Sequence, residues 1–221
     1  MIAAVSPHLD DAVLSCGALL AAHPGSLVIT VLAGGKASWD TVTPWDASCG
    51  FSPGEDVIAA RRAEDAEALQ RLRARPLWLD FLDAQYGGPP PVDEMTAALE
   101  QAISLQRPDM LVVPLGLFHS DHLAVAEASI PLVHAGLARA SYAYEDVPYR
   151  RTPGLVAAAV GRLAKRGITA DPAPFHAPVR AHDQKRRAVR CYRSQLRGLS
   201  SEGRAGYDDA FRPEGRFRLH T

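Results

Sequence analysis

The sequence predicts a doubly wound α/β fold with a mostly parallel sheet, and three observations support this. Short apolar runs alternate along the chain with longer segments of helical periodicity. The run LVITVL at 27–32 is uninterrupted and rich in β-branched residues, which is typical of a strand covered on both faces. The alternation of strand and helix repeats four times, and such repeats build parallel sheets through right-handed crossovers. We therefore expect a Rossmann-like sandwich with helices on both faces, forming one domain over residues 1–221.

Each expected element follows from its residue pattern. Buried strands are expected at the apolar runs 2–5, 27–32, 77–82, 110–113 and 140–144. Helices are expected where apolar residues recur near the helical period, at 10–22, 55–73, 92–105, 120–137, 155–166 and 182–196. The stretch 168–179 is expected to be extended and the tail 200–221 irregular. The segment 34–54, rich in Trp, Pro and Gly, is longer than ordinary loops, which favours a binding loop or lid.

Composition and charge exclude several classes of protein. Charged residues make up 22% of the chain and hydrophobic ones 47%, which argues against disorder. The net charge of -1 gives no overall field, and the basic segment 180–197 is interpreted as a solvated helix face. No signal peptide is evident, and no run approaches the roughly 20 apolar residues that span a bilayer. We therefore expect no nucleic-acid or membrane partner.

The cysteines bear on the compartment in which the protein works. They are three in number and widely spaced, which is neither a disulfide framework nor a CxxC zinc pattern. Unpaired thiols of this kind fit a reducing compartment best. We expect a cytoplasmic protein. The three cysteines are Cys16, Cys49 and Cys191.

Polar motifs follow the ends of the predicted strands, where ligands bind in doubly wound sheets. The first, PHLDD at 7–11, follows the first strand and begins a helix. His8 and Asp11 are three residues apart and can turn toward one point, whereas Asp10 projects roughly 100° away around the helix. One carboxylate can thus bind a cation while its neighbour faces what the cation binds. A helix N-cap explains one aspartate, but not a second aspartate and a histidine.

The second motif, HSDH at 119–122, follows the fourth predicted strand. His119 and His122 flank Asp121, and imidazole nitrogens with a carboxylate oxygen suit zinc. Taken alone, this motif could equally be a surface turn that contains histidine. Both motifs lie at the same edge of one predicted sheet, so together they predict a metal site. Catalytic zinc sites typically use three protein ligands and leave one position open.

The motifs resemble those of a known enzyme family. PHLDD resembles the HPDD signature of the PIG-L/LmbE-like deacetylases, and HSDH resembles their HxDH signature. The segment RRAEDAEALQRL carries the family's R-x-x-E pattern at Arg61 and Glu64, and YEDVPY (144–149) and YRSQ (192–195) resemble further landmarks. The resemblance covers about 5–195. It implies one zinc ion per chain, or another divalent metal, and the removal of N-acetyl groups from sugars.

The resemblance also implies a role for each matching residue. Asp10 would be the general base, and His119 the acid or the group that stabilises the oxyanion. Asp121 would hold a ring N–H of a neighbouring histidine, as outer carboxylates do. Ala12 stands where the family has glutamate, which removes one polar group near the site. The metal ligands would be His8, Asp11 and His122.

Three further residues are candidate substrate contacts. Arg61 is one, although an ion pair with Glu64 three residues on is an alternative. Trp39 and Trp45 in the long segment could stack on a sugar or simply pin the loop in place.

The expected function is that of a zinc-dependent deacetylase of an N-acylated amino sugar or glycoside, such as a bacterial secondary metabolite or a thiol-cofactor precursor. The stretch SPHLDDAVLS resembles the branch of the family that acts on antibiotic-type glycosides. Two alternatives stay open. One is a zinc amidase acting on a thiol or glycoside conjugate, and the other is a non-catalytic sugar- or nucleotide-binding protein.

Overall fold

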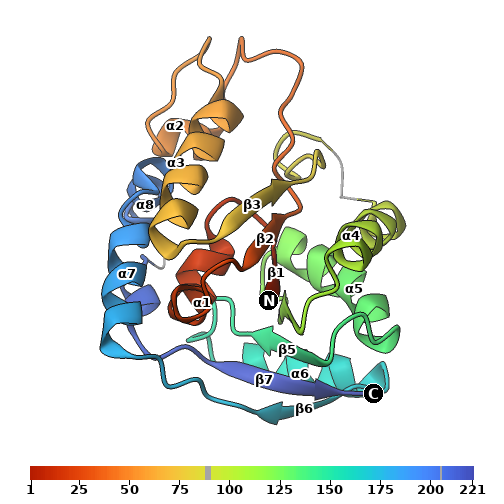
Figure 1. The fold of residues 1–221 in the computed structure, drawn as a ribbon. Coiled ribbons are helices and arrows are strands. Elements are labelled where there is room, and N and C mark those ends of the chain that lie inside the picture. Colours follow the sequence, from red (N-terminus) through yellow and green to blue (C-terminus); the bar gives the residue numbers. More distant parts are fainter. Residues whose placement is uncertain (88–90, 205) are drawn as a thin grey trace.

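A mixed β-sheet forms the centre of the molecule in the computed structural model, which describes residues 1–87, 91–204 and 206–221 (Figure 1). Within these residues the sheet has seven strands, in the order β3-β2-β1-β4-β5-β7-β6. Its strands are β1 (Ile2–Ser6), β2 (Leu27–Thr30), β3 (Arg75–Trp78), β4 (Met110–Pro114), β5 (Ala140–Tyr144), β6 (Thr169–Pro172) and β7 (Arg216–His220).

The sheet reverses its winding at β1, which lies between β2 and β4. β1 pairs in parallel with both neighbours, with Val5 opposite Ile29 and Ala4 opposite Val112. All five residues of β1 are buried, as expected for a central strand of a sheet that is covered on both faces. Ligands bind at such a reversal point, outside the carboxyl ends of the strands. The segments that follow β1 and β4 are therefore the expected location of a ligand site.

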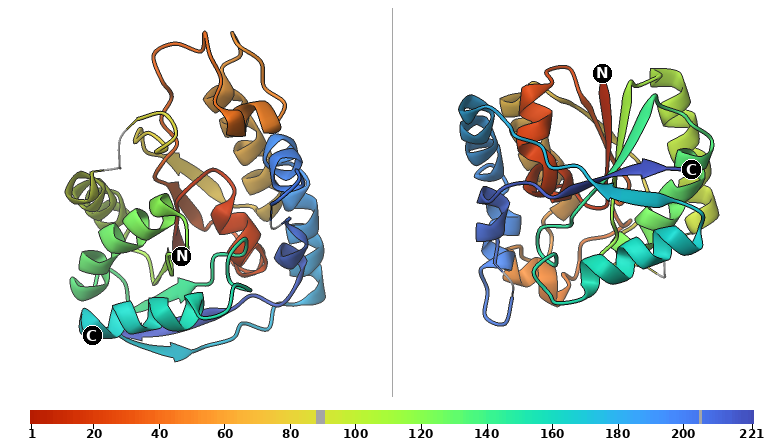
Figure 2. Two further views of the ribbon diagram at one scale, coloured as in Figure 1. Left: turned by 180° about the vertical axis from the view of Figure 1, so that it is seen from behind. Right: turned by 90° about the horizontal axis from the view of Figure 1, so that it is seen from below.

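Helices cover both faces of the sheet in two layers, which Figure 2 shows from below. One layer packs into a core with residues such as Leu14, Leu69 and Val189, and the other with residues such as Leu99 and Val125. The first layer contains α1 (Asp11–Ala22), α3 (Val57–Leu72) and α7 (Val179–Val189). The second contains α4 (Val92–Gln106), α5 (Ser120–His134) and α6 (Leu155–Lys165). Shorter helices are α2 (Pro44–Ser48), α8 (Arg193–Leu199) and the 3-10 turn η1 (Asp208–Phe211). No helix within the described residues is long and apolar enough to cross a bilayer.

The predicted fold class is confirmed, but the third strand lies earlier than expected. The sequence predicted a strand at 77–82, whereas β3 occupies Arg75–Trp78. β3 lies at the edge of the sheet and pairs with β2, and the register ends where Thr30 meets Trp78. The apolar residues Leu79 and Phe81 then pack against the core of the second helix layer rather than extending the strand.

The C-terminal part of the chain differs most from the prediction. The helix expected at 182–196 is two helices, α7 and α8, and the tail expected to be irregular contains η1 and β7. β6 lies within the stretch 168–179, which was expected to be extended. β7 is inserted between β5 and β6 and runs antiparallel to both. The partners of β7 are far away along the chain, so no local pattern predicted the pairing.

The C-terminal segment also supports the helix that begins at the first motif. α1 is kinked at Cys16, whose φ of -132° and ψ of 26° are not helical. Just beyond the kink, the N–H groups of Ala18 and Leu19 donate to the carboxylate of Glu214 at 2.7 and 3.1 Å. Lys185 pairs with Glu214 at 2.8 Å in the interior. Lys185 is therefore an exception to the predicted solvated basic face.

Candidate active site

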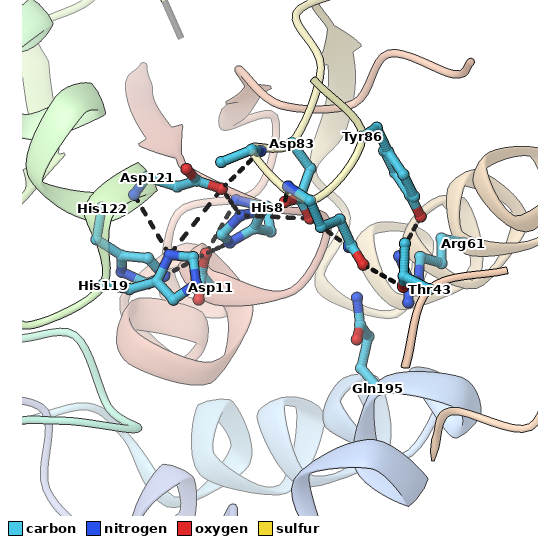
Figure 3. A network of polar contacts seen from close by, with 12 residues as sticks. His8, Asp11, Thr43, Arg61, Asp83, Tyr86, His119, Asp121, His122 and Gln195 are labelled. Atoms are coloured by element: carbon cyan, nitrogen blue, oxygen red, sulfur yellow. Dashed lines mark hydrogen bonds and ion pairs between the residues drawn. The ribbon is translucent and has the colours of Figure 1, made fainter. Parts of the chain in front are cut away.

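The two predicted motifs meet at the carboxyl ends of β1 and β4 (Figure 3). PHLDD forms the turn from β1 into α1, and HSDH forms the turn from β4 into α5. Asp83, from the segment after β3, and Asp146, from the segment after β5, complete a ring of polar side chains around them. The predicted juxtaposition of the two motifs at one sheet edge is thus what the structure contains.

Three side chains converge closely enough to share a metal ion. His8, Asp11 and His122 each offer a ligand atom, and these atoms lie within 4.8 Å of one another. Asp11 Oδ2 is 3.1 Å from His8 Nδ1 and 3.3 Å from His122 Nε2. The same oxygen accepts the backbone N–H of His8 at 2.9 Å, which holds the carboxylate in place. Two imidazoles and one carboxylate are a donor set typical of catalytic zinc.

In both histidines of this set, the ring nitrogen that faces away from Asp11 contacts a buried carboxylate. Asp121 Oδ2 lies 3.0 Å from His8 Nε2, and Asp146 Oδ1 lies 2.6 Å from His122 Nδ1. In neutral imidazole one nitrogen carries the proton, and an adjacent carboxylate fixes that proton on its own side. The remaining nitrogen, the one near Asp11, then presents its lone pair as a ligand does. The donor set and its supporting carboxylates therefore fit a divalent metal.

Asp146 is a functional candidate to which the sequence assigned no role. Its second oxygen accepts the N–H groups of Gly116 and Leu117 at 3.0 and 3.2 Å. The side chain is therefore anchored to the segment between β4 and α5 while it orients His122. A signal was present, because Asp146 lies in YEDVPY directly after a buried strand.

His119 also belongs to a second cluster of possible ligands, with His8 and Asp121. In that cluster His8 would use the nitrogen that faces Asp121, so the carboxylate support described above would be lost. His119 Nδ1 accepts the N–H of Asp121 at 3.3 Å and thereby caps α5. Burial, together with the nearby charges of His8 and His122, lowers the pKa of His119 below its usual value. The lowered pKa favours the neutral ring, and the Nδ1 that accepts the N–H of Asp121 leaves Nε2 as the nitrogen that carries the proton.

The two adjacent aspartates ionise very differently. Burial, with the neighbouring charge of Asp11, raises the pKa of Asp10 to about 7. Burial opposes ionisation of Asp11 too, but His122 and His8 outweigh it and hold the pKa of Asp11 well below its usual range. Two carboxylates whose pKa values are driven apart in this way are typical of an acid–base site.

Asp10 does not act as a helix cap, although it occupies the N-cap position of α1. Its side chain makes no capping hydrogen bond to the described residues. The N–H of Ala12 donates instead to Ser6 Oγ at 3.0 Å. Asp10 lines the cavity described next, so its carboxylate is available for chemistry.

A cavity of about 470 Å³ opens over the cluster. A volume of this size is typical of sites for small molecules. Its wall combines polar groups such as Asp83 and Gln195 with apolar ones such as Trp45 and Tyr149. Such a mixed wall suits a ligand that has both hydroxyl groups and apolar faces.

Arg61 lines the cavity but does not pair with Glu64. Its guanidinium contacts Asp46 Oδ1 at 2.9 Å and donates to Tyr86 Oη at 3.1 Å. Glu64 instead accepts the N–H and hydroxyl of Ser194 at the start of α8. The ion-pair alternative from the sequence is therefore wrong, because Glu64 bonds to Ser194 of α8 and Arg61 pairs with Asp46 of α2. Arg61 Nε is buried without a partner among the described residues and can still serve a ligand.

The two tryptophans of the long segment lie in different places. Trp45 lines the cavity, whereas Trp39 is not among the described residues that do. The Trp39 ring contacts Tyr86 edge to face at 5.4 Å between centroids, and the Lys36 ammonium lies over it at 4.9 Å. The contact roles predicted for both tryptophans stay predictions, but the geometry favours Trp45.

The long segment is attached to the candidate metal site through a chain of hydrogen bonds (Figure 3). Thr43 Oγ1 donates to Gln85 Oε1 at 2.5 Å, and Gln85 Nε2 donates to Asp83 Oδ2 at 2.7 Å. The same Asp83 oxygen lies 3.8 Å from His8 Nε2. The segment therefore forms part of the wall of the site.

A doubly wound sheet with this donor set at its reversal point belongs to the class of metal-dependent α/β hydrolases. Residues 3–133, more than half of the chain, match the PIG-L family model, which is described as GlcNAc-PI de-N-acetylase. The chain belongs to the PIG-L family, as its motifs implied, and is a hydrolase of the deacetylase type.

Solved structures of similar fold carry the same indication. A triple mutant of a deacetylase of the teicoplanin biosynthetic pathway is 26% identical, with a TM-score of 0.82 over 99% of this chain and 97% of that chain. The A40926 pseudoaglycone deacetylase is 26% identical, with a TM-score of 0.76 over 99% and 95%. A zinc-inhibited form of teicoplanin deacetylase, 24% identical, has a TM-score of 0.78 over 99% and 97% and shares the fold. Among curated protein sequences, none matches this chain.

Proposed function

We propose that the protein is a zinc-dependent deacetylase that removes an N-acetyl group from an amino-sugar glycoside of secondary metabolism. The observation that carries this proposal is the cluster of His8, Asp11 and His122, in which each histidine is backed by a buried carboxylate. Asp10, with its pKa near 7, stands beside this cluster and lines the cavity. The neighbours named for teicoplanin and A40926 pseudoaglycone support a glycoside as the substrate class.

Different residues of the chain would perform different steps of amide hydrolysis. When bound, a zinc ion polarises an amide carbonyl and acidifies water to a pKa of about 7. Asp10 accepts the proton of the attacking water, for which a pKa near the working pH is well suited. The water oxygen bonds to the acetyl carbon, the carbon–nitrogen bond breaks, and the proton leaves with the amine. General acid–base catalysis of this kind is typically worth about 10²–10⁴-fold in rate.

His119 is the second proton-handling group of the proposal. Because its Nδ1 accepts a backbone N–H, its Nε2 carries the proton and can donate. It would donate to the oxyanion as negative charge develops there, or pass the proton to the departing amine. Its partial exposure and its place in the cavity wall allow contact with substrate. Arg61 and Trp45, which line the same cavity, would contact the sugar.

The boundaries and the compartment are also inferred. Strands near both ends of the chain, β1 and β7, lie in one sheet, which supports a single domain over 1–221. All three cysteines are free and buried, which supports a reducing, cytoplasmic environment without disulfides.

Acetate release tests the proposal. The protein is stripped with a chelator, reloaded with one equivalent of zinc, and given N-acetylglucosamine glycosides. We expect the zinc-loaded protein to release acetate and the stripped protein to be inactive. His122→Ala should lose both metal and activity, while His134→Ala, a change of an exposed histidine on the same helix, should keep both. Full metal occupancy in His122→Ala would contradict the ligand assignment. Hydrolysis of thiol conjugates in preference to N-acetyl sugars would favour the amidase alternative.

A further inference from the structure

Phe118, next to His119, has an unusual backbone conformation. Its φ is 59°, and the N–H of His119 donates to the carbonyl of Leu117 at 2.7 Å. Phe118 is therefore the central residue of a γ-turn with positive φ, which is the rare and strained form of this turn. The other non-glycine residues with positive φ among those described are Arg73 and Arg107. Both end helices as left-handed caps, where this conformation is common, whereas Phe118 precedes a helix.

The side chain of Phe118 points away from the core. The residue is 68% exposed, and it is the only aromatic among the described large apolar residues that are exposed. Its ring packs against Tyr149, with centroids 5.3 Å apart and planes tilted by 38°. Tyr149 lines the cavity and contacts His122 edge to face, at 5.3 Å and 83°. A row of rings therefore leads from the candidate ligand His122 through Tyr149 to solvent at Phe118.

Stability does not explain a phenylalanine at this position. A bulky side chain at positive φ is a backbone outlier, and glycine would adopt this turn without strain. The exposed ring also recovers little of the hydrophobic gain that burial of a phenylalanine provides. Strained residues of this kind cluster at ligand-binding and catalytic sites. The strain here holds an aromatic ring against Tyr149, which lines the cavity.

We propose that Phe118 and Tyr149 form an aromatic platform that binds the aglycone of the substrate, and that this aglycone carries an aromatic ring. The inference rests on the proposed function, in which the acetamide lies at the metal cluster. A glycoside bound in this way extends from the cluster toward solvent, along the row of rings. One exposed ring beside a cavity is far too small for a stable protein–protein interface. It suits the flat face of a small-molecule aglycone, which stacks on aromatic rings in an offset or edge-on geometry.

Two matched substrates test the platform. The methyl and phenyl β-glycosides of N-acetylglucosamine differ only in the aglycone, and acetate release gives kcat and KM for each. We expect the wild-type protein to show a KM that is lower for the phenyl glycoside by roughly 3- to 10-fold, with similar kcat. Phe118→Gly removes the ring and relieves the turn, so this KM preference should fall toward one. Phe118→Tyr should keep the preference.

The controls separate the platform from the fold and from the proposed activity. Leu105→Ala removes an exposed apolar side chain on α4 and should leave the preference unchanged. Because glycine suits the turn, Phe118→Gly should not lower Tm; a lowered Tm together with an unchanged preference would make Phe118 structural and overturn the proposal. Calorimetric binding of the deacetylated methyl and phenyl glycosides gives a second readout, which needs no hydrolysis. Absence of acetate release with preferential phenyl binding would reject only the deacetylase assignment, whereas equal binding of the two glycosides would reject the platform.

Discussion

Asp146 joins His122 to the backbone of the neighbouring loop. One of its oxygens lies 2.6 Å from His122 Nδ1, and the other accepts the N–H groups of Gly116 and Leu117. The carboxylate has an acceptor for every donor that faces it, so the ring of His122 is fixed in both orientation and tautomer.

Asp146→Asn should therefore weaken metal binding without removing a ligand. An amide has one acceptor oxygen, and its NH2 group would face either the imidazole N–H or the backbone N–H groups. We expect zinc affinity to fall by about 10- to 100-fold, which is typical for loss of such an outer partner. Competition with a chromophoric chelator measures the affinity. Asp109→Asn, a change of an exposed aspartate, is the control. Equal affinities in the two variants would show that Asp146 does not orient His122.

Changing each aspartate of PHLDD to Asn should impair a different property, metal binding for Asp11 and kcat for Asp10. Asp11→Asn loses an anionic ligand, so we expect weaker metal binding and partial rescue of activity by added zinc. Asp10→Asn should keep its metal and lose about 10²-fold or more in kcat, because an amide cannot accept the proton. The helix should survive, since Asp10 makes no capping hydrogen bond to the described residues. Metal content and kcat are measured side by side. Loss of metal in Asp10→Asn, with Asp11→Asn intact, would reverse the two roles.

The two tryptophans of the long segment provide a matched pair. Trp45 lines the cavity, whereas Trp39 packs against Tyr86. Trp45→Ala should raise KM for an N-acetylglucosamine glycoside several-fold, with little change in kcat, because apolar contact with the sugar is lost. Trp39→Ala should affect KM less and lower Tm instead. Steady-state kinetics and thermal melts of both variants decide the matter, and a larger KM effect in Trp39→Ala would contradict the placement.

Asp65 predicts a pH dependence of stability away from the site. Burial raises its pKa to about 6, although Trp78 Nε1 and Tyr192 Oη each donate to it at 2.7 Å. Because the folded state holds this proton more tightly than the unfolded chain, the contribution of Asp65 to the free energy of unfolding falls as pH rises from about 4 to 6 and then stays level. Asn can accept from Trp78 and donate to Tyr192 without charge. Asp65→Asn should therefore be more stable than wild type at pH 7, by up to about 3 kcal/mol. Urea unfolding from pH 4 to 7 measures the difference in the free energy of unfolding between the variant and wild type. A difference that does not shrink below pH 6 would be inconsistent with a buried charge at Asp65.

Local sequence patterns were enough to predict the fold class and the position of the candidate site. The alternation of apolar runs and helical segments is local, and it was sufficient to predict the five parallel strands. PHLDD and HSDH each follow a buried strand, and parallel strands bring their carboxyl ends to one edge. Their convergence therefore follows from local pattern plus one topological rule. The family resemblance carried the roles of individual residues, which spacing alone left open.

The distant groups that complete the site are brought together by the folding of the chain and were not predicted from the sequence. Asp146 bonds to His122, and Arg61 pairs with Asp46 instead of Glu64. Glu214, near the other end of the chain, accepts a backbone N–H of α1. β7 inserts between β5 and β6 in the same way. None of these pairings has a periodicity to detect, because each depends on where the sheet order and the loops bring the chain back. Local sequence specifies the conformation of a segment, whereas the burial of a charged side chain requires a partner without specifying which residue it is.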